Sequence, residues 1–361
     1  MIEYLEDNKY KITYKDKSIV TTFYEEISDE LYQSILDEYN KRPSKREVCN
    51  QLYDVSKGNT QLKCINDYYF KDLMDNTKVY YNNWSIKEFF ECKDLVEIAI
   101  AKINQHRDFY SSEDSLYNNI KMCLRLGNKG VASNVYNFPI DRVNDILNIY
   151  NINNNYYDFS CGWGARLLSA LAHNINYFGT DPNDVLCERL VELEKDYKKV
   201  NSCKSKVKIF NQGSECLIDE LINTIGVAFS SPPYFCLEDY RIGNQSYKEG
   251  MEYDDWLNNY LKPTFENIRL YLIDSGYFII NINDFAKYTL VKDTIEIATN
   301  AGFKYLGKHI LHNNQRINEK KTLNDNSEGI FIFCKDTSNN TLRTLSDENR
   351  VKSNIKNKKL F

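Results

Sequence analysis

From Tyr156 onward, short apolar runs of strand length alternate with longer helical patterns. This alternation predicts parallel strands in one sheet, with helices over both faces. The last two predicted strands have no helix between them, so we expect them to pair antiparallel. The chain is therefore predicted to have an α/β fold with a mostly parallel, seven-stranded sheet that ends in an antiparallel hairpin. The predicted strands are Tyr156–Ser160, Asn176–Thr180, Lys206–Phe210, Val227–Ser230, Tyr277–Ile282, Phe303–Ile310 and Gly329–Cys334.

The helices of this region are predicted at Arg166–His173, Asp184–Lys199, Ser214–Asn223, Asp254–Tyr271 and Leu290–Asn300. Residues 1–130 lack the alternation and are predicted to form a smaller, mainly helical region. It should contain a hairpin of Lys9–Tyr14 and Ser18–Phe23 and helices at Asp29–Tyr39, Lys45–Ser56, Ile86–Phe90 and Leu95–Gln105. We expect residues 131–340 to form the second domain and residues 341–361 to form a charged, flexible tail.

Charge and cysteine usage exclude several classes of protein. The formal net charge is −5 over 361 residues, which argues against a non-specific coat on nucleic acid and requires any DNA-binding face to be local. The ten cysteines are scattered without a CxxC pair or a histidine cluster, so we expect reduced thiols and no metal site. The polar start MIEYLEDNKY and the lack of an 18-residue apolar run predict a cytoplasmic protein without a membrane helix.

Two motifs point to a nucleoside-containing cofactor. The first predicted strand runs into Asp158-Phe-Ser-Cys-Gly162-Trp-Gly164 and then directly into a helix, where glycines permit a sharp turn and close approach of a ligand. Leu167 occupies the position of the third glycine of the dinucleotide fingerprint, which weakens an NAD or FAD interpretation. The second strand ends in Asp181, where α/β folds bind a ribose diol. The alternative is a structural turn and a helix-capping aspartate.

The third motif is Ser231-Pro232-Pro233-Tyr234, directly after the fourth predicted strand. The prolines have no N–H and fix the backbone, while the Ser231 hydroxyl and the Pro232 carbonyl both accept hydrogen bonds. Two such acceptors suit an exocyclic amino group, because they would disperse the charge that develops as the nitrogen is alkylated. Tyr234 offers a flat face to a base. The alternative is a simple loop turn.

In their order, D-F-S-C-G-W-G, G-T-D-P and S-S-P-P-Y-F resemble the S-adenosylmethionine-dependent DNA amino-methyltransferases, which modify adenine N6 or cytosine N4. With the later segment D-S-G-Y-F-I-I-N-I-N-D, the resemblance is to a branch common in phages and other viruses and extends over Ser133–Lys335. It implies a Rossmann-like class I methyltransferase fold, S-adenosyl-L-methionine as cofactor and DNA as substrate, with the target base flipped out of the duplex. Such enzymes serve restriction–modification, but the sequence does not decide whether a cognate nuclease exists.

The resemblance also implies roles for individual residues. The cofactor's methionine part would be held by Asp158, Cys161, Gly162 and Gly164, with Phe138 and Pro139 as further contacts. Asp181 would bind the ribose, and Gln212 and Gly213 would border the adenine. Ser231, Pro232, Pro233 and Tyr234 would form the catalytic corner. The sequence departs from the family at Phe159, where a proline is usual, and at Trp163, where a small residue is common between the glycines.

Residues 1–130 are the predicted DNA-reading part, because only a short segment, Lys287–Phe361, follows the core. Three basic clusters are candidate phosphate contacts: Lys41–Glu47, Lys198–Lys208 and Asn314–Lys321. Trp84, Tyr240 and Trp256 are candidates for stacking on bases, with core packing favoured for both tryptophans.

Two alternatives keep part of this interpretation. The substrate amine could belong to tRNA or rRNA, since the acceptor pair does not distinguish nucleic acids. The chain could instead be a catalytically silent cofactor-binding adaptor, although the presence of Asp158, Asp181 and the Ser-Pro-Pro-Tyr motif counts against it. Serine in the first position of the motif leans toward cytosine N4 over adenine N6.

Overall fold

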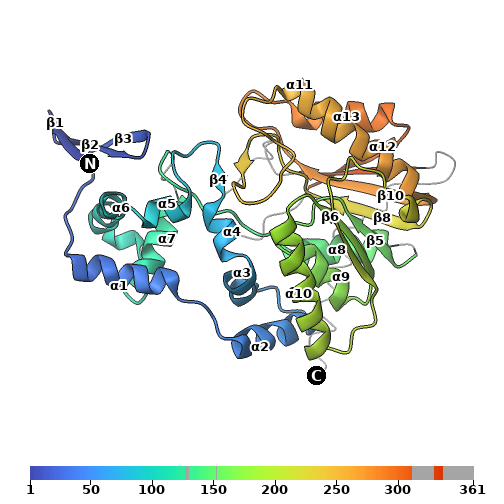
Figure 1. The fold of residues 1–361 in the computed structure, drawn as a ribbon, viewed down its shortest axis with the longest axis horizontal. Helices are drawn as coiled ribbons and strands as arrows, with labels where there is room; N and C mark the ends of the chain where they lie inside the picture. Colours follow the sequence, from blue (N-terminus) through green and yellow to red (C-terminus); the bar gives the residue numbers. More distant parts are fainter. Residues whose placement is uncertain (127–129, 152, 311–328, 336–361) are drawn as a thin grey trace.

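The computed structural model describes residues 1–126, 130–151, 153–310 and 329–335. Its main element is a seven-stranded sheet with the order β11-β12-β10-β8-β5-β6-β7 (Figure 1). Strands β7, β6, β5, β8 and β10 are parallel, and β12 runs antiparallel to both β10 and β11. The predicted sheet and its terminal hairpin are thus confirmed. The strands are β5 (Asn155–Asp158), β6 (Asn176–Asp181), β7 (Val207–Asn211), β8 (Ile225–Ser230), β10 (Leu272–Ile282), β11 (Lys304–Ile310) and β12 (Gly329–Cys334).

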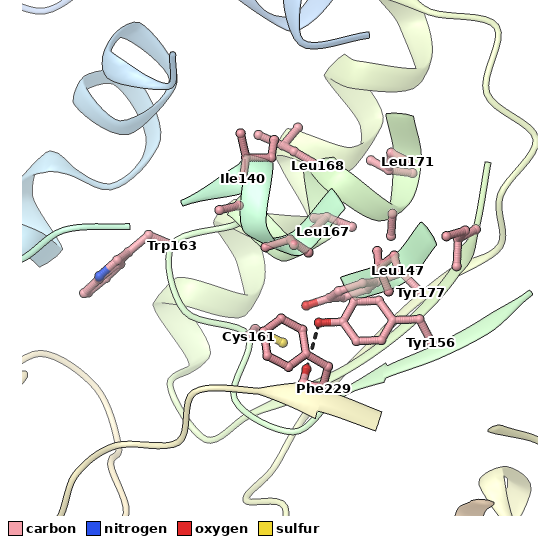
Figure 2. Packing of buried hydrophobic residues seen from close by; sticks show 14 of the residues in the cluster. Ile140, Leu147, Tyr156, Cys161, Trp163, Leu167, Leu168, Leu171, Tyr177 and Phe229 are labelled. Carbon is pink, nitrogen blue, oxygen red and sulfur yellow. Dashed lines mark hydrogen bonds between the residues drawn. The ribbon is translucent and has the colours of Figure 1, made fainter. Parts of the chain in front are cut away.

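Helices cover both faces of the sheet (Figure 1). One face packs against α8 (Ile140–Tyr150), α9 (Ala165–Ala172) and α10 (Asp184–Val200), and the other against α12 (Lys262–Tyr271) and α13 (Leu290–Asn300). Each face of the sheet has its own hydrophobic core, and successive strand residues point into alternate cores. Val227 and Phe229 of β8 lie in the first core, and Ala228 lies in the second. Figure 2 shows the first core, where the Tyr156 hydroxyl donates to the Phe229 carbonyl at 2.8 Å.

Two predicted helices differ from the structure, and both differences have local causes. Residues 214–223 contain only a 3₁₀ turn, Asp219–Leu221. The helical bond from the Ile218 N–H to the Ser214 carbonyl cannot form, because Ile218 donates to the Tyr271 hydroxyl and the Ser214 carbonyl accepts from Asn267.

The predicted helix Asp254–Tyr271 is interrupted by a π-turn. It consists of α11 (Tyr253–Trp256), the π-turn Leu257–Leu261 and α12. Pro263 stands in the first turn of α12 and lacks an N–H, so a continuous α-helical ladder is broken there. The wider π-turn carries Tyr260 toward the region where the motifs meet.

The N-terminal region contains more helices and strands than predicted. β1 (Ile2–Leu5) joins the predicted hairpin through a three-residue turn, 6–8, in which Asp7 and Asn8 have positive φ. The helices α3, α4 and α7 were not predicted. The elements are β2 (Lys9–Tyr14), β3 (Lys17–Thr21), α1 (Asp29–Asn40), α2 (Lys45–Ser56), α3 (Lys63–Tyr69), α4 (Lys71–Asn76), α5 (Ile86–Phe90), α6 (Lys93–Gln105) and α7 (Leu116–Leu126).

The N-terminal elements pack in two groups. Helices α1, α5, α6 and α7 surround a core of their own that includes Trp84, Phe89 and Ile120. Helix α2 instead lies against α10 and α9, and its Leu52 belongs to the same core as Leu193 (Figure 1). The sheet's hydrophobic core therefore extends to a helix that precedes β5 by a hundred residues in the chain.

A short antiparallel ladder connects the N-terminal region to the loop that follows β8. β4 (Lys78–Val79) pairs with β9 (Glu238–Asp239), and the Tyr80 N–H donates to the Leu237 carbonyl at 2.8 Å. Next to this ladder, the Arg241 guanidinium lies 2.8 Å from the Glu88 carboxylate. These contacts fix the loop after β8 against α5.

We predict that Leu52→Ala lowers the free energy of unfolding of the sheet domain by about 2–5 kcal/mol, because it leaves a cavity between α2 and α10. Leu52 is fully buried. The measurement is denaturant unfolding followed by circular dichroism. Leu31→Ala, at a position 40% exposed on α1, is the control and should stay within about 0.5 kcal/mol of wild type. A wild-type midpoint for Leu52→Ala would contradict the shared core.

Candidate active site

The loop between β5 and α9 contains two glycines with different surroundings. Gly162 and Gly164 have φ values of +56° and +79°, a conformation that L side chains rarely adopt. A Cβ on Gly164 would lie 2.8 Å from the Leu193 side chain, so this glycine lets α9 pack closely on α10. Gly162 instead lines two adjoining cavities. Of the two predicted glycines, only Gly162 therefore faces the site.

Asp158 lies beneath this loop and not on a cavity wall. Its side chain has no exposed surface and accepts hydrogen bonds from Arg166 Nε and the Tyr177 hydroxyl, both at 2.9 Å. Arg166 also donates to the Ser160 carbonyl, so the buried ion pair ties β5, the loop and the first turn of α9 together. Cys161 is likewise buried, against Gly179 and Tyr177 of β6. The structure thus places both residues as supports of the loop.

We name the first of the two cavities the inner cavity; its volume is about 80 Å³. Asp181 lies at the end of β6 in its wall and accepts the N–H of Asn183 at 3.1 Å. Burial raises the pKa of Asp181 to about 7. Across the cavity, the Tyr260 hydroxyl of the π-turn lies 3.2 Å from Ser160 Oγ. Its lining residues are Phe159, Ser160, Gly162, Trp163, Asp181, Pro182, Asn183, Leu186, Ser214, Ser231, Pro233, Tyr240, Asn244, Gln245, Ser246 and Tyr260.

Gln212 and Gly213, predicted to border an adenine, do not line the inner cavity; their neighbour Ser214 does. The Gln212 side chain donates to the Cys216 carbonyl. Trp163 packs in the cavity wall between Phe70 and Tyr240, with ring centroids 6.3 and 5.8 Å away. In Figure 2 it points away from the rest of the core, so the bulky residue between the glycines faces the site and not the sheet.

We name the second cavity the outer groove; its volume is about 430 Å³. Phe138 and Pro139 line it just before α8, with the Phe138 ring edge-on to Phe229. Glu238 also faces it; burial raises the pKa of this carboxyl, which accepts a hydrogen bond from Tyr240. The lining residues are Tyr136, Asn137, Phe138, Pro139, Arg142, Gly162, Trp163, Arg166, Ser231, Pro232, Pro233, Tyr234, Leu237, Glu238, Tyr240 and Asn281.

The Ser231–Tyr234 corner stands between the two cavities. Ser231 and Pro233 line both, while Pro232 and Tyr234 line the outer groove. Asn281 of β10 holds the corner: its Nδ2 donates to Ser231 Oγ at 3.1 Å and to the Tyr234 hydroxyl at 3.0 Å. Sequence reasoning did not single out Asn281. The available signal was a polar residue near the end of the otherwise apolar strand Tyr277–Ile282.

This arrangement has a definite chemical capability. A ligand in the inner cavity meets a carboxylate at one end and hydroxyl oxygens along its wall, whereas a flat group in the outer groove meets hydrogen-bond acceptors and aromatic faces. Ser231 is common to both cavities, so two ligands would meet there. Within the described part of the chain, no cluster of three or more His, Cys, Asp or Glu side chains could hold a metal ion.

The remaining sequence candidates fall in other places. Trp84 and Trp256 are buried, which confirms core packing for both, and Tyr240 lies in the cavity wall. The cluster Asn314–Lys321 and residues 341–361 lie outside the described residues. Among the residues that the structure describes, no helix has the length and apolar character needed to cross a membrane.

Comparisons with known proteins give one family and a set of distant folds. Residues 225–360 match a family model described as DNA methylase, a segment that begins at β8 and includes the Ser231–Tyr234 corner and Asn281. No curated protein matches the chain.

The solved structures similar to this chain include S-adenosylmethionine-dependent methyltransferases. One is an O-methyltransferase from Thermotoga maritima (TM-score 0.35, 10% identity, covering 56% of this chain and 66% of that one). Another is a methyltransferase from Clostridium acetobutylicum (TM-score 0.37, 14% identity, 55% and 91%). A third is a TehB-like methyltransferase from Corynebacterium glutamicum (TM-score 0.36, 12% identity, 66% and 97%). The match spans just under two thirds of the Thermotoga protein.

The family match covers the strand, the corner and the positioning asparagine that the geometry singles out. It agrees with the resemblance seen in the sequence. The match of residues 225–360 to this family model supports an S-adenosyl-L-methionine-dependent DNA methyltransferase that acts on adenine N6 or cytosine N4.

Proposed function

We propose that this protein methylates the N4 amino group of cytosine or the N6 amino group of adenine in DNA at the Ser231–Tyr234 corner. The observation that carries the proposal is that Ser231 and Gly162 line both cavities, while Asp181 lies in the wall of the inner one. A cofactor that lies along the glycine loop from Asp181 would end beside the corner, where the amino group of a base in the outer groove would meet it.

The residues of the inner cavity fit S-adenosyl-L-methionine. Asp181 offers a carboxylate to a ribose diol, and Gly162 permits close approach of the backbone. Ser160, Ser214 and Tyr260 supply hydroxyl groups around the same space. When bound, the cofactor supplies an electrophilic methyl group on a sulfonium. The inner cavity is below the ~300–1,000 Å³ of typical ligand pockets, so the cofactor would also occupy the adjoining outer groove.

The corner's own groups account for activation of the amine. Ser231 Oγ and the Pro232 carbonyl would accept the two amino hydrogens, which turns the nitrogen lone pair out of the ring plane and toward the methyl carbon. The same acceptors would stabilise the positive charge that the nitrogen gains as its bond to carbon forms and the carbon–sulfur bond breaks. Tyr234, held by Asn281, would stack on the base. Because a paired base cannot reach the groove, the target nucleotide would turn out of the duplex.

We expect Ser231→Ala to lower kcat for methyl transfer by about 10²-fold, because one of the two charge-stabilising acceptors is lost. Cofactor affinity should stay near wild type, since the residues beside Asp181 are unchanged. The assay is transfer of labelled methyl groups to plasmid DNA from a host without DNA methylation, with total RNA in a parallel reaction. Ser275→Ala, at an exposed position near the start of β10, is the matched control. Undiminished transfer by Ser231→Ala would overturn the mechanism, and transfer to RNA alone would overturn the substrate.

The raised pKa of Asp181 gives a pH dependence to cofactor binding. The ionised carboxylate accepts hydrogen bonds from ribose hydroxyls, so affinity should be full above pH ~7 and should fall by about tenfold per pH unit below it, as the group takes up a proton. Asp181→Asn should bind more weakly above pH ~7 and lack this step. Calorimetric titration with the cofactor across this range measures both. An identical pH profile in the two proteins would show that Asp181 does not contact the ribose.

A further inference from the structure

A third cavity separates the N-terminal helices from the sheet domain. This cavity, which we name the basic cleft, has a volume of about 800 Å³. One wall comes from α3, α4, α5 and α7, and the other from residues 134–142. Tyr136, Asn137, Phe138, Pro139 and Arg142 line both the basic cleft and the outer groove. The two spaces therefore adjoin one another, and the outer groove reaches Ser231.

The α7 wall carries a stripe of cations and an aromatic ring. Tyr117, Lys121 and Arg125 are four residues apart, so they lie on one face of α7, and all three line the basic cleft. The adjacent face of α7 is buried through Ile120, Cys123 and Leu124. Packing of the apolar face thus fixes the direction of the stripe, which extends about 12 Å along the cleft.

The charge of the basic cleft is positive, although the whole chain carries −5. Two of its acidic residues are neutralised within the wall, because Asp67 pairs with Lys63 at 2.8 Å and Asp75 pairs with Lys71. Lys121 and Arg125 of α7 add two more positive charges to the lining, where the remaining carboxylate is Asp141. A positive cleft in an acidic protein is a local binding surface for a polyanion.

The opposite wall presents an aromatic ring at the same level. Tyr136 is 59% exposed, and the Arg125 guanidinium lies 5.8 Å from its ring centroid. A cation beside an exposed ring, above an entrance to a base-sized groove, is the combination by which proteins hold a nucleic acid strand: charge contacts the phosphates and the ring stacks on a base.

We infer that the basic cleft holds the DNA strand next to the target nucleotide, with Lys121 and Arg125 on its phosphates and Tyr136 against a neighbouring base. This inference rests on the proposed function and adds the route by which the substrate reaches Ser231. It also gives α7, which belongs to the N-terminal region, a direct part in DNA binding. The contacts to phosphate are independent of base sequence.

The test is the double variant Lys121→Ala/Arg125→Ala. For binding to a random-sequence DNA duplex, the slope of log K against log salt concentration should be shallower than that of wild type by about 2. This is a change of about 1 for each lost phosphate contact. KM for plasmid DNA should rise by about tenfold or more, while kcat at saturating DNA is retained. Lys121→Arg/Arg125→Lys should keep the wild-type slope, because either cation can contact a phosphate.

The matched control is Lys292→Ala/Lys304→Ala, which removes the same charge at exposed positions of α13 and β11, outside the candidate phosphate-contact clusters. Its salt slope should equal that of wild type, and cofactor affinity should be unchanged in every variant, which shows that each is folded. A wild-type slope and KM in Lys121→Ala/Arg125→Ala would overturn the inference. An equal loss of DNA binding in the control variant would also overturn it. The same holds if the salt slope changes for binding to RNA or to an acidic polypeptide but not for binding to DNA. If the wild-type protein transfers no methyl group to DNA, the proposed function is wrong. The salt dependence of DNA binding in the variants would still test whether the basic cleft binds DNA.

Discussion

The site depends on the hydrogen bonds that Asn281 makes to the corner after β8. A Pro-Pro corner has no backbone N–H of its own to hold it in place. The parallel register pairs Ile280 of β10 with Ser230 of β8, which places Asn281 beside Ser231. The side-chain nitrogen of Asn281 donates to Ser231 and Tyr234, and its backbone carbonyl accepts from the Tyr234 hydroxyl at 3.1 Å. A side chain on the neighbouring strand thus supplies the donors that the prolines lack.

Two carboxylates of the site, Asp158 and Asp181, lie in different surroundings. Asp158 is fully buried with Arg166 and Tyr177 and keeps the glycine loop in position. A buried ion pair of this kind is costly to break, because one charge would be left without a partner. Within the part of the chain that the structure describes, no Lys or Arg is hydrogen-bonded to Asp181, which lies in a cavity wall and has a raised pKa. Under the proposed function, cofactor recognition and loop stability would therefore be carried by different acidic residues, each at the end of a strand of the same sheet.

Much of this organisation could be predicted from the sequence, because it is encoded locally. The apolar runs gave the strands, and the Gly-x-Gly and Ser-Pro-Pro-Tyr motifs follow strands whose ends meet at one edge of a parallel sheet. What the sequence did not predict depends on contacts between distant segments. The lost helix at 214–223 reflects bonds to Asn267 and Tyr271, and the packing role of Gly164 depends on Leu193. The basic cleft needs α7 and residues 134–142 side by side, which no local pattern indicates.

The N-terminal region contributes to the site in more than one way. α2 completes the core under α9 and α10, β4 holds the loop after β8, and α7 forms a wall of the basic cleft. Removal of this region would therefore affect the sheet domain and, under the inference drawn for the basic cleft, DNA binding as well. These contacts give a physical reason for the region to remain attached to the catalytic part in a single chain.

The most direct test of the account is the kinetics of Asn281→Ala. We predict that kcat falls by about 10²-fold, because Ser231 and Tyr234 lose the donor that aims them, while cofactor affinity and the thermal midpoint stay close to those of the control Asn155→Ala. Asn155 loses a similar hydrogen bond, to the Thr224 carbonyl, at the opposite end of the sheet. Wild-type turnover in Asn281→Ala, or a loss of turnover that Asn155→Ala shares, would contradict the account.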